Sequence, residues 1–286
     1  MSIKLEDVTY VYNKGLAHES VALDKICFEI RSGEFVGIIG HTGSGKSTLI
    51  QQLNGILNPD KGKIFVDEID ITDSKVSMQE IRKKVGLVFQ YPEYQLFEET
   101  VAKDIAFGPL NLGLSQEESE DRVKDALEMV GLSYQELKER SPFELSGGQK
   151  RRVAIAGVVA MHPEILILDE PTAGLDPKAH DDILNMLKQI HERENNTIIL
   201  VSHNMQDVAE IADRIIVMDH GKIALIGTPL EVYREGALIQ EIGLELPPIM
   251  LFMEELRKRG IRIQDSVLTM KDAVSALKLI LEKRNL

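Results

Sequence analysis

The chain has 286 residues, of which 43% are hydrophobic and 28% charged, and its formal net charge is -13. This length suits one large domain with an appended piece, and the acidic excess argues against a nucleic-acid-binding surface, which would need a basic patch. Cys27 is the only cysteine, so an internal disulfide and a cysteine-rich metal site are excluded. No signal-peptide pattern follows Met1, and no stretch reaches the roughly 18 apolar residues of a membrane span. We therefore expect a cytoplasmic protein that reaches a membrane only through partners.

Two strand patterns occur in the chain. Apolar residues alternate with polar ones around Val8 and again around Ile26, as in half-buried antiparallel strands. Strands covered on both faces are indicated by continuous apolar runs at 35–39, 85–89, 165–168, 197–201 and 215–218. Because helical patterns separate these runs, we predict an α/β fold with a parallel core and an antiparallel β subdomain.

From residue 90 the strand patterns give way to helical ones, which predicts a helical insert at about 91–161. Capping boxes at the start of two helices in this insert are indicated by Ser115 with Glu118 and by Ser133 with Glu136.

Later signals define the end of the main domain. Asp176-Pro177 has the residue types of a helix N-cap and first turn, and His220-Gly221 those of a hairpin turn. We predict a main domain at 1–235 and a small, mainly helical C-terminal extension at 236–286.

The segment from Gly40 to Ser47 fits the phosphate-loop motif G-x-x-x-x-G-K-[ST] between a buried strand and a helix. Its glycines allow backbone N–H groups to face a phosphate, and the helix N-terminus adds positive potential. Lys46 is expected to reach the β- and γ-phosphate oxygens of ATP, and the Ser47 hydroxyl to ligate Mg²⁺. The predicted nucleotide-binding residues are Gly40, His41, Thr42, Gly43, Ser44, Gly45, Lys46, Ser47 and Thr48.

Polar side chains follow three further buried strands. Asp169 and Glu170 follow the run 165–168, at the edge where α/β sheets bind ligands. Asp169 is predicted to hold Mg²⁺ through its water shell, and Glu170 to orient or deprotonate the attacking water. Gln90 could ligate Mg²⁺ or that water, and His203 could hydrogen-bond the γ-phosphate. The predicted metal ligands are thus Ser47, Gln90 and Asp169, and the predicted catalytic residues are Glu170, His203 and Gln90.

Leu145-Ser146-Gly147-Gly148-Gln149 is a second glycine-rich turn that opens a helix, where free backbone N–H groups can face an anion. A single domain already has such a site in its phosphate loop. The second turn therefore suggests that ATP is held between two copies of the fold, each closing over the other's nucleotide.

Together these motifs follow the order found in ABC-type ATPases, which the chain resembles over residues 1 to about 235. The resemblance implies an ATP hydrolase whose two subunits meet head to tail. It implies that the turn with Ser146, Gly147, Gly148 and Gln149 faces the partner's γ-phosphate, and that Asp176 communicates across the interface. Tyr12 matches the aromatic residue that stacks on adenine, and Tyr10 is an alternative.

The segment from Gln90 to Pro109 is similar to that of energy-coupling factor (ECF) transporter ATPases, and residues 94–97 most resemble the second ATPase subunit of the vitamin-transporting members. This resemblance implies a peripheral motor subunit at the cytoplasmic face of the cell membrane, powering uptake of vitamins or other micronutrients. The implied partners are a second ABC ATPase subunit, a transmembrane coupling protein and a membrane substrate-binding subunit that selects the cargo. Homodimer and heterodimer both stay open.

Two surfaces have candidate partners. Four acidic residues beside Gln90 could receive a basic coupling helix of the membrane protein, namely Glu93, Glu98, Glu99 and Asp104. The two C-terminal helical patterns, at about 248–259 and 271–283, could form a dimer contact or pack on their own core.

The nearest rival functions are an ATPase of a cobalt or nickel ECF system and an ATPase of an ordinary ABC transporter. A soluble ABC ATPase acting on nucleic acid or ribosomes is disfavoured, because the chain has neither a long coiled-coil insertion nor a second cassette. A catalytically silent cassette is disfavoured because Lys46, Glu170, Ser146 and His203 are all present.

Overall fold

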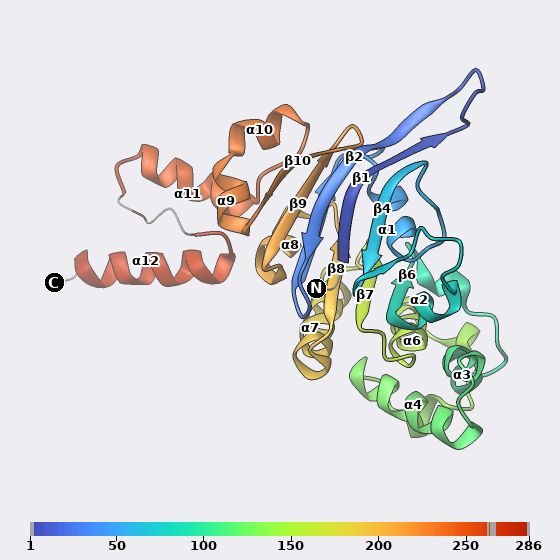
Figure 1. The fold of residues 1–286 in the computed structure, drawn as a ribbon. Helices are drawn as coiled ribbons and strands as arrows, with labels where there is room; N and C mark the ends of the chain where they lie inside the picture. The colour runs from blue at the N-terminus through green and yellow to red at the C-terminus, as the bar shows by residue number, and fades with distance from the viewer. Residues whose placement is uncertain (1–2, 262, 264–266, 285–286) are drawn as a thin grey trace.

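The computed structural model describes residues 3–261, 263 and 267–284, and its strands form two sheets (Figure 1). The antiparallel sheet has the order β2-β1-β4-β5, with β1 (Ile3–Tyr12), β2 (Ser20–Ile30), β4 (Lys61–Val66) and β5 (Ile69–Asp70). The larger sheet has the order β10-β9-β3-β8-β7-β6, with β3 (Phe35–Gly40), β6 (Val85–Val88), β7 (Ile165–Asp169), β8 (Thr197–Val201), β9 (Arg214–Asp219) and β10 (Lys222–Gly227). Only β10 pairs antiparallel in the larger sheet.

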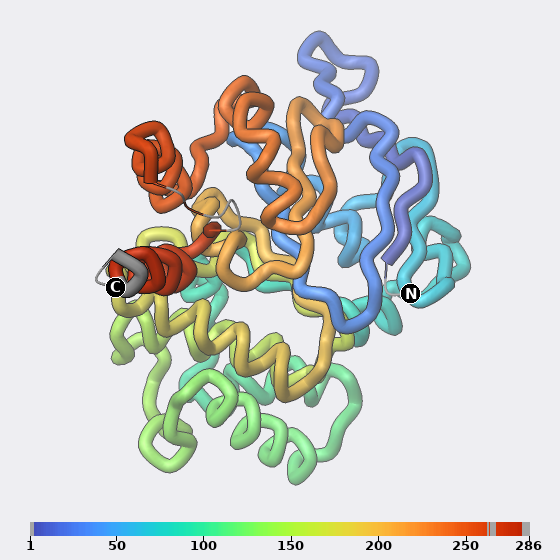
Figure 2. Tube along the Cα trace, turned by 90° about the vertical axis from the view of Figure 1, so that its left-hand side faces the viewer, coloured from blue at the N-terminus to red at the C-terminus, as the bar shows by residue number. Residues whose placement is uncertain are grey.

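Helices cover both faces of the larger sheet. The first two are α1 (Lys46–Leu53) and α2 (Met78–Lys84), and the insert holds α3 (Val101–Asn111), α4 (Gln116–Met129), α5 (Tyr134–Leu137) and α6 (Gly147–Val159). Then follow α7 (Pro177–Glu194), α8 (Met205–Ile211), α9 (Pro229–Arg234), α10 (Gly236–Glu241), α11 (Pro248–Lys258) and α12 (Met270–Arg284). The insert lies at one end of the molecule and α11 and α12 at the other, on the side that faces the viewer in Figure 2.

Alternating side chains of the central strands build two separate apolar layers. Ile165 and Ile167 pack with the antiparallel sheet and α1, whereas Leu166 and Leu168 pack with the helical insert and α7. All five β7 residues are buried and the first four are apolar, so the strand is covered on both faces, as its sequence predicts. Burial of this strand fixes where its carboxyl end, Asp169, emerges.

Most predicted helices and strands are present. Two exceptions, a capping box and a strand, are explained by their local sequence. The Ser115–Glu118 capping box forms with both hydrogen bonds, but Ser133 makes no side-chain cap, so the second predicted box is wrong. Strand β4 went unpredicted because its first half is exposed and polar, and only Ile64 and Val66 are buried.

The C-terminal helices pack partly on their own core. Ile249 and Met253 of α11 are buried with Val267 and Ala273, while Phe252 stays 51% exposed. Upstream of these helices, buried residues on both sides of residue 235 share one apolar cluster with β9 and α8. The division after residue 235 stays a prediction. Within the residues that the structure describes, no helix is long and apolar enough to cross a bilayer.

Candidate functional site

The phosphate loop joins β3 to α1, and its glycines are required by the backbone. Gly45, just before α1, has a φ of 103°, and a Cβ there would lie 2.5 Å from the backbone oxygen of Ala22. Gly43 has a φ of 82°, a region that residues with a Cβ rarely adopt. The loop therefore turns tightly enough for its N–H groups to line a cavity.

Lys46 begins α1 and is held inside the loop. Its Nζ donates to the backbone oxygens of Gly40 at 2.7 Å and His41 at 3.0 Å. Burial lowers the pKa of Lys46, while the carboxylates of Glu170 and Asp169 oppose this shift. The Lys46 side chain thus extends along the loop, and its ammonium group is held by two backbone carbonyl groups that another acceptor can replace.

Ser47 and Asp169 come together from two different elements. The Ser47 hydroxyl donates to Asp169 Oδ2 at 3.2 Å. Asp169 is 8% exposed, and burial raises the pKa of its carboxyl group although the Ser47 hydrogen bond opposes this. A buried carboxylate beside a hydroxyl is an all-oxygen set of the kind that Mg²⁺ prefers.

Glu170 lies at the centre of a second polar group. His203 Nε2 is 2.5 Å from Glu170 Oε1, and the Gln90 amide donates to Glu170 Oε2 at 3.1 Å. The backbone of Glu170 has a φ of 50°, an uncommon conformation for a residue with a side chain, and such positions gather at functional sites. All three residues follow strands of the same sheet, as predicted.

These side chains surround one cavity of about 460 Å³. Its lining includes Gln90, Glu170, His203 and most of the phosphate loop, namely Thr42, Gly43, Gly45, Lys46, Ser47 and Thr48. Tyr12 also lines it, and its hydroxyl lies 3.1 Å from the Thr48 hydroxyl. Tyr10 contacts Tyr12 edge-on and packs against the apolar core instead.

Three of the predicted loop residues, Gly40, His41 and Ser44, do not line the cavity. The His41 side chain is directed to Asp219 rather than into the cavity. Ser44 is fully buried. Any contact that His41 makes with a nucleotide in the cavity would therefore come from its backbone.

The glycine-rich turn forms the N-terminus of α6. Ser146 accepts a hydrogen bond from the Gln149 N–H at 3.3 Å, and Gln149 Oε1 accepts one from the Ser146 N–H at 3.1 Å. This capping box went unrecognised, although Ser and Gln at this spacing signal it. None of residues 145–149 lines the cavity of the phosphate loop.

The two glycines of this turn are not required by the chain's own packing. A Cβ at Gly147 would meet nothing within 4 Å, and one at Gly148 would lie 4.0 Å from the Cβ of Ala179. Neither has a positive φ. Nearby, Asp176 caps α7 by accepting from the N–H groups of Lys178 and Ala179, both at 3.0 Å.

Only part of the predicted acidic docking surface is available to a partner. Glu93 is paired inward with Arg151, and Asp104 accepts from the N–H groups of Phe97 and Glu98, both at 2.9 Å. Glu99 pairs with Lys103 at 2.7 Å and is 82% exposed. Two of the four predicted acids, Glu93 and Asp104, therefore serve the fold of the segment, and Glu98 and Glu99 remain for a partner.

Comparisons with known proteins agree with this geometry. A model of the ABC transporter family matches residues 23–173. "Energy-coupling factor transporter ATP-binding protein EcfA2" of Caldanaerobacter subterraneus subsp. tengcongensis is 65% identical over 96% of this chain and 95% of its own length. The protein of that name from Clostridioides difficile is 54% identical over all of both chains. The chain belongs to the ATP-binding proteins of energy-coupling factor transporters, within the ABC transporter family.

Solved structures support the same placement. The structure of cbiO1 from Clostridium perfringens, described as part of the ABC transporter complex cbiONQ, is 41% identical with a TM-score of 0.75, and the match covers 88% of this chain and 98% of that one. A dimeric ATP-binding cassette bound to ADP and Pi is 31% identical with a TM-score of 0.70, and covers 79% of this chain and 98% of that one. The predicted ABC-type fold and the predicted role of an ATPase that powers an ECF transporter are confirmed.

Proposed function

We propose that Glu170 is the general base of ATP hydrolysis in the cavity of the phosphate loop. Its carboxylate reaches the cavity and is held from two sides, by Gln90 and by His203. A positioned carboxylate can orient and deprotonate an attacking water. His203 would donate to the γ-phosphate, and Gln90 would report the bound state to the helical insert.

The phosphate loop would bind ATP through its N–H groups and Lys46, with Tyr12 stacking on the adenine. Tyr12 lines the cavity whereas Tyr10 packs on the core, which favours Tyr12 over Tyr10. The residues present fit a magnesium ion, because the Ser47 hydroxyl already lies against the buried Asp169 carboxylate. Ser47, Asp169 and Gln90 would hold that ion, which supplies charge neutralisation at the phosphates.

The glycine-rich turn would act on the nucleotide of a second ATPase subunit. It lies outside its own cavity, and Gly147 and Gly148 leave open space where side chains would fit. A glycine in a helix costs about 0.5–1 kcal/mol relative to alanine. No close contact within this chain requires glycine at these two positions. Close approach of the partner's γ-phosphate to Ser146 and Gly148 would explain why glycines are present in this turn. Asp176 would lie beside them at the interface.

A membrane coupling protein would dock in the groove between α2 and the insert. This hollow of about 520 Å³ is lined by apolar residues such as Phe89, Leu96 and Phe107, and Phe107 stays 47% exposed. Phe97, which packs edge-on against Phe107, is 57% exposed. Arg82 and Asp104 also line this hollow, and Glu98 lines the adjacent hollow that shares Phe107 with it. An amphipathic helix with basic residues suits an apolar groove beside the acidic residues Glu98 and Glu99.

The whole assembly would therefore take up a small cargo, of the vitamin or micronutrient class, at the cytoplasmic face of the cell membrane. This chain, a second ATPase subunit, the coupling protein and a substrate-binding membrane subunit would be its components. The cavity of the phosphate loop in this chain is lined by residues suited to bind a nucleotide. This supports the proposal that another subunit selects the cargo.

The catalytic assignment is tested with Glu170→Gln, which keeps the shape of the side chain and removes the base. We expect unchanged ATP affinity and a loss of turnover of about 10²–10⁴-fold in the assembled transporter. Glu164→Gln is the matched control, because Glu164 immediately precedes β7, at its other end, and is 59% exposed. Near-normal hydrolysis by Glu170→Gln would refute the assigned role.

A further inference from the structure

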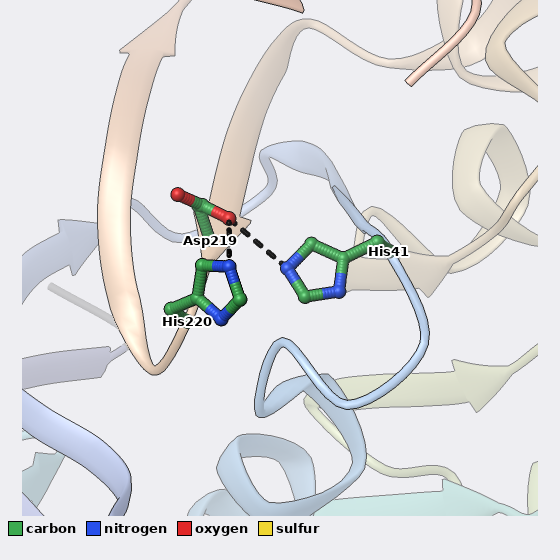
Figure 3. Close-up of side chains that lie close together, drawn as sticks. All are labelled: His41, Asp219 and His220. Atoms are coloured by element: carbon green, nitrogen blue, oxygen red, sulfur yellow. Dashed lines mark hydrogen bonds and ion pairs between the residues drawn. The ribbon is translucent and has the colours of Figure 1, made fainter. Parts of the chain in front are cut away.

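His41, Asp219 and His220 lie together beside the phosphate loop (Figure 3). His41 Nε2 is 3.0 Å from Asp219 Oδ1, and His220 Nε2 is 3.7 Å from the same oxygen. One possible ligand atom from each residue lies within 4.8 Å of the other two. Two imidazoles and one carboxylate are a donor set suited to Zn²⁺ and related divalent transition metals.

Both ring nitrogens of His41 lie near oxygen atoms of the protein. Nδ1 lies 2.8 Å from the backbone oxygen of Thr42, which can only accept, so Nδ1 carries a proton. Nε2 then faces Asp219 Oδ1, a second acceptor. Nε2, the nitrogen that would ligate the ion, therefore lies on the side of the ring that faces Asp219. An Nδ1–H bound to a backbone carbonyl is also how metal-bound histidines are commonly oriented.

The backbone already brings the three residues close together. The Gly221 N–H donates to the Ser44 oxygen at 3.0 Å, which fastens the turn between β9 and β10 to the phosphate loop. His220 and Gly221 have φ values of 44° and 76°, as in the tight turn that their sequence predicts. His220 is 83% exposed, so rotation of its side chain can complete the site without moving the core.

An ion at this place would have solvent access and further negative charge nearby. The cluster borders a hollow of about 570 Å³ whose other wall is formed by Leu238, Glu241, Ile242 and Gly243, in and just after α10. Asp219 and His41 are 28% and 25% exposed, which holds two of the donors in place while the third stays reachable.

We propose that His41, Asp219 and His220 bind one divalent transition-metal ion, Zn²⁺ foremost, with water completing its coordination. The ion would join the phosphate loop to the turn between β9 and β10. It would be separate from the magnesium ion proposed at Asp169, because Mg²⁺ prefers oxygen ligands and imidazole suits Zn²⁺.

The test is a calorimetric titration of the full chain with Zn²⁺ in excess Mg²⁺. We expect one tight ion per chain, and at least a tenfold weaker affinity in His220→Asn, roughly the minimum cost of disturbing a metal site. Asparagine before glycine is favoured in this type of turn, so His220→Asn keeps the fold. His18→Asn, another exposed histidine, is the matched control and should bind as the parent does.

A second measurement locates the ion directly. The imidazole signals of both His41 and His220 should shift on addition of Zn²⁺ in nuclear magnetic resonance spectra. His203→Asn probes the rival position beside Asp169 and Glu170. Equal affinity in His220→Asn, or loss of the ion in His203→Asn instead, would overturn the proposal.

Discussion

Arg151 and Glu93 form a bidentate ion pair inside the molecule. Arg151 Nε lies 3.0 Å from Glu93 Oε2, and Nη2 lies 2.6 Å from Oε1. The Arg151 side chain is 3% exposed and that of Glu93 18%. Arg151 Nη1 also donates to the backbone oxygens of Pro171 at 3.1 Å and Ala173 at 2.7 Å. One guanidinium group thus links three segments.

Each linked segment carries a proposed functional group. Glu93 follows Gln90, Arg151 lies on the helix that begins at the glycine-rich turn, and Pro171 follows Glu170. A change at Gln90 can therefore reach the glycine-rich turn, which we propose acts on the partner's nucleotide, through one buried contact. We infer that Arg151 positions these segments relative to one another.

Removing Glu93 should destabilise the fold strongly. Glu93→Ala leaves the buried Arg151 charge without its partner, and breaking such a pair costs about 3–5 kcal/mol. Urea denaturation monitored by circular dichroism measures the loss. Glu99→Ala is the control, because Glu99 pairs with Lys103 on the surface and should leave the free energy of unfolding almost unchanged. Equal losses in the two variants would contradict the positioning role.

The Glu93 contribution should depend on pH in the acid range. Burial opposes the shift, but the Arg151 hydrogen bonds and charge lower the pKa of Glu93 overall. A lowered pKa in the folded state gives stability that is present above the unfolded value of 4.5 and lost as pH falls through the folded value. The stability difference between the parent chain and Glu93→Gln should therefore stay constant from pH 7 to about pH 5 and shrink below about pH 4.5. A constant difference down to pH 3.5 would count against the pair.

Gly148→Ala should separate stability from activity. A Cβ there has room, so the helix should gain up to about 1 kcal/mol from the better helix former. ATPase activity of the assembled transporter should nevertheless fall, because the added methyl group faces the partner. Asn185→Ala, at an exposed position of α7, is the control, because it also replaces a poorer helix former by alanine. If both variants keep full activity, the turn does not face a nucleotide.

Charge reversal of the two remaining outward acids should weaken assembly. Glu98→Lys with Glu99→Lys is expected to reduce co-purification with the membrane coupling protein while ATP affinity stays the same. Asp121→Lys with Glu128→Lys on α4 changes the net charge equally on a different exposed surface. Unchanged recovery of the complex in the first variant, or equal loss in the second, would refute the docking site.

Strand ends were predictable from the sequence, because a run of buried apolar residues must end where the first polar group meets the cavity. This places Asp169, Glu170 and His203 at one edge of one sheet. The direction of each side chain was not predictable. His41 fits the phosphate-loop motif, yet its ring turns to Asp219, a partner 178 residues away.

The predicted acidic docking surface was only partly correct for a similar reason. Four acids close together in sequence look like one surface, but the buried Arg151 takes Glu93, and Asp104 takes two backbone N–H groups. The Asp104 partners are local, six and seven residues away, whereas the Glu93 pair joins residues 58 positions apart and forms only once α6 packs against residues 92–95. Short-range spacing carries no information about such long-range pairs.

The central claim is that each ATP is completed by the glycine-rich turn of another subunit. ATP binding by the isolated chain should therefore be within about twofold of the parent in Gly147→Arg, a difference well under 1 kcal/mol, whereas Lys46→Ala should lose it. In the assembled transporter the same Gly147→Arg change should reduce turnover by about 10²-fold or more. If Gly147→Arg instead loses ATP affinity in the isolated chain as Lys46→Ala does, the turn serves its own cavity and the account is wrong.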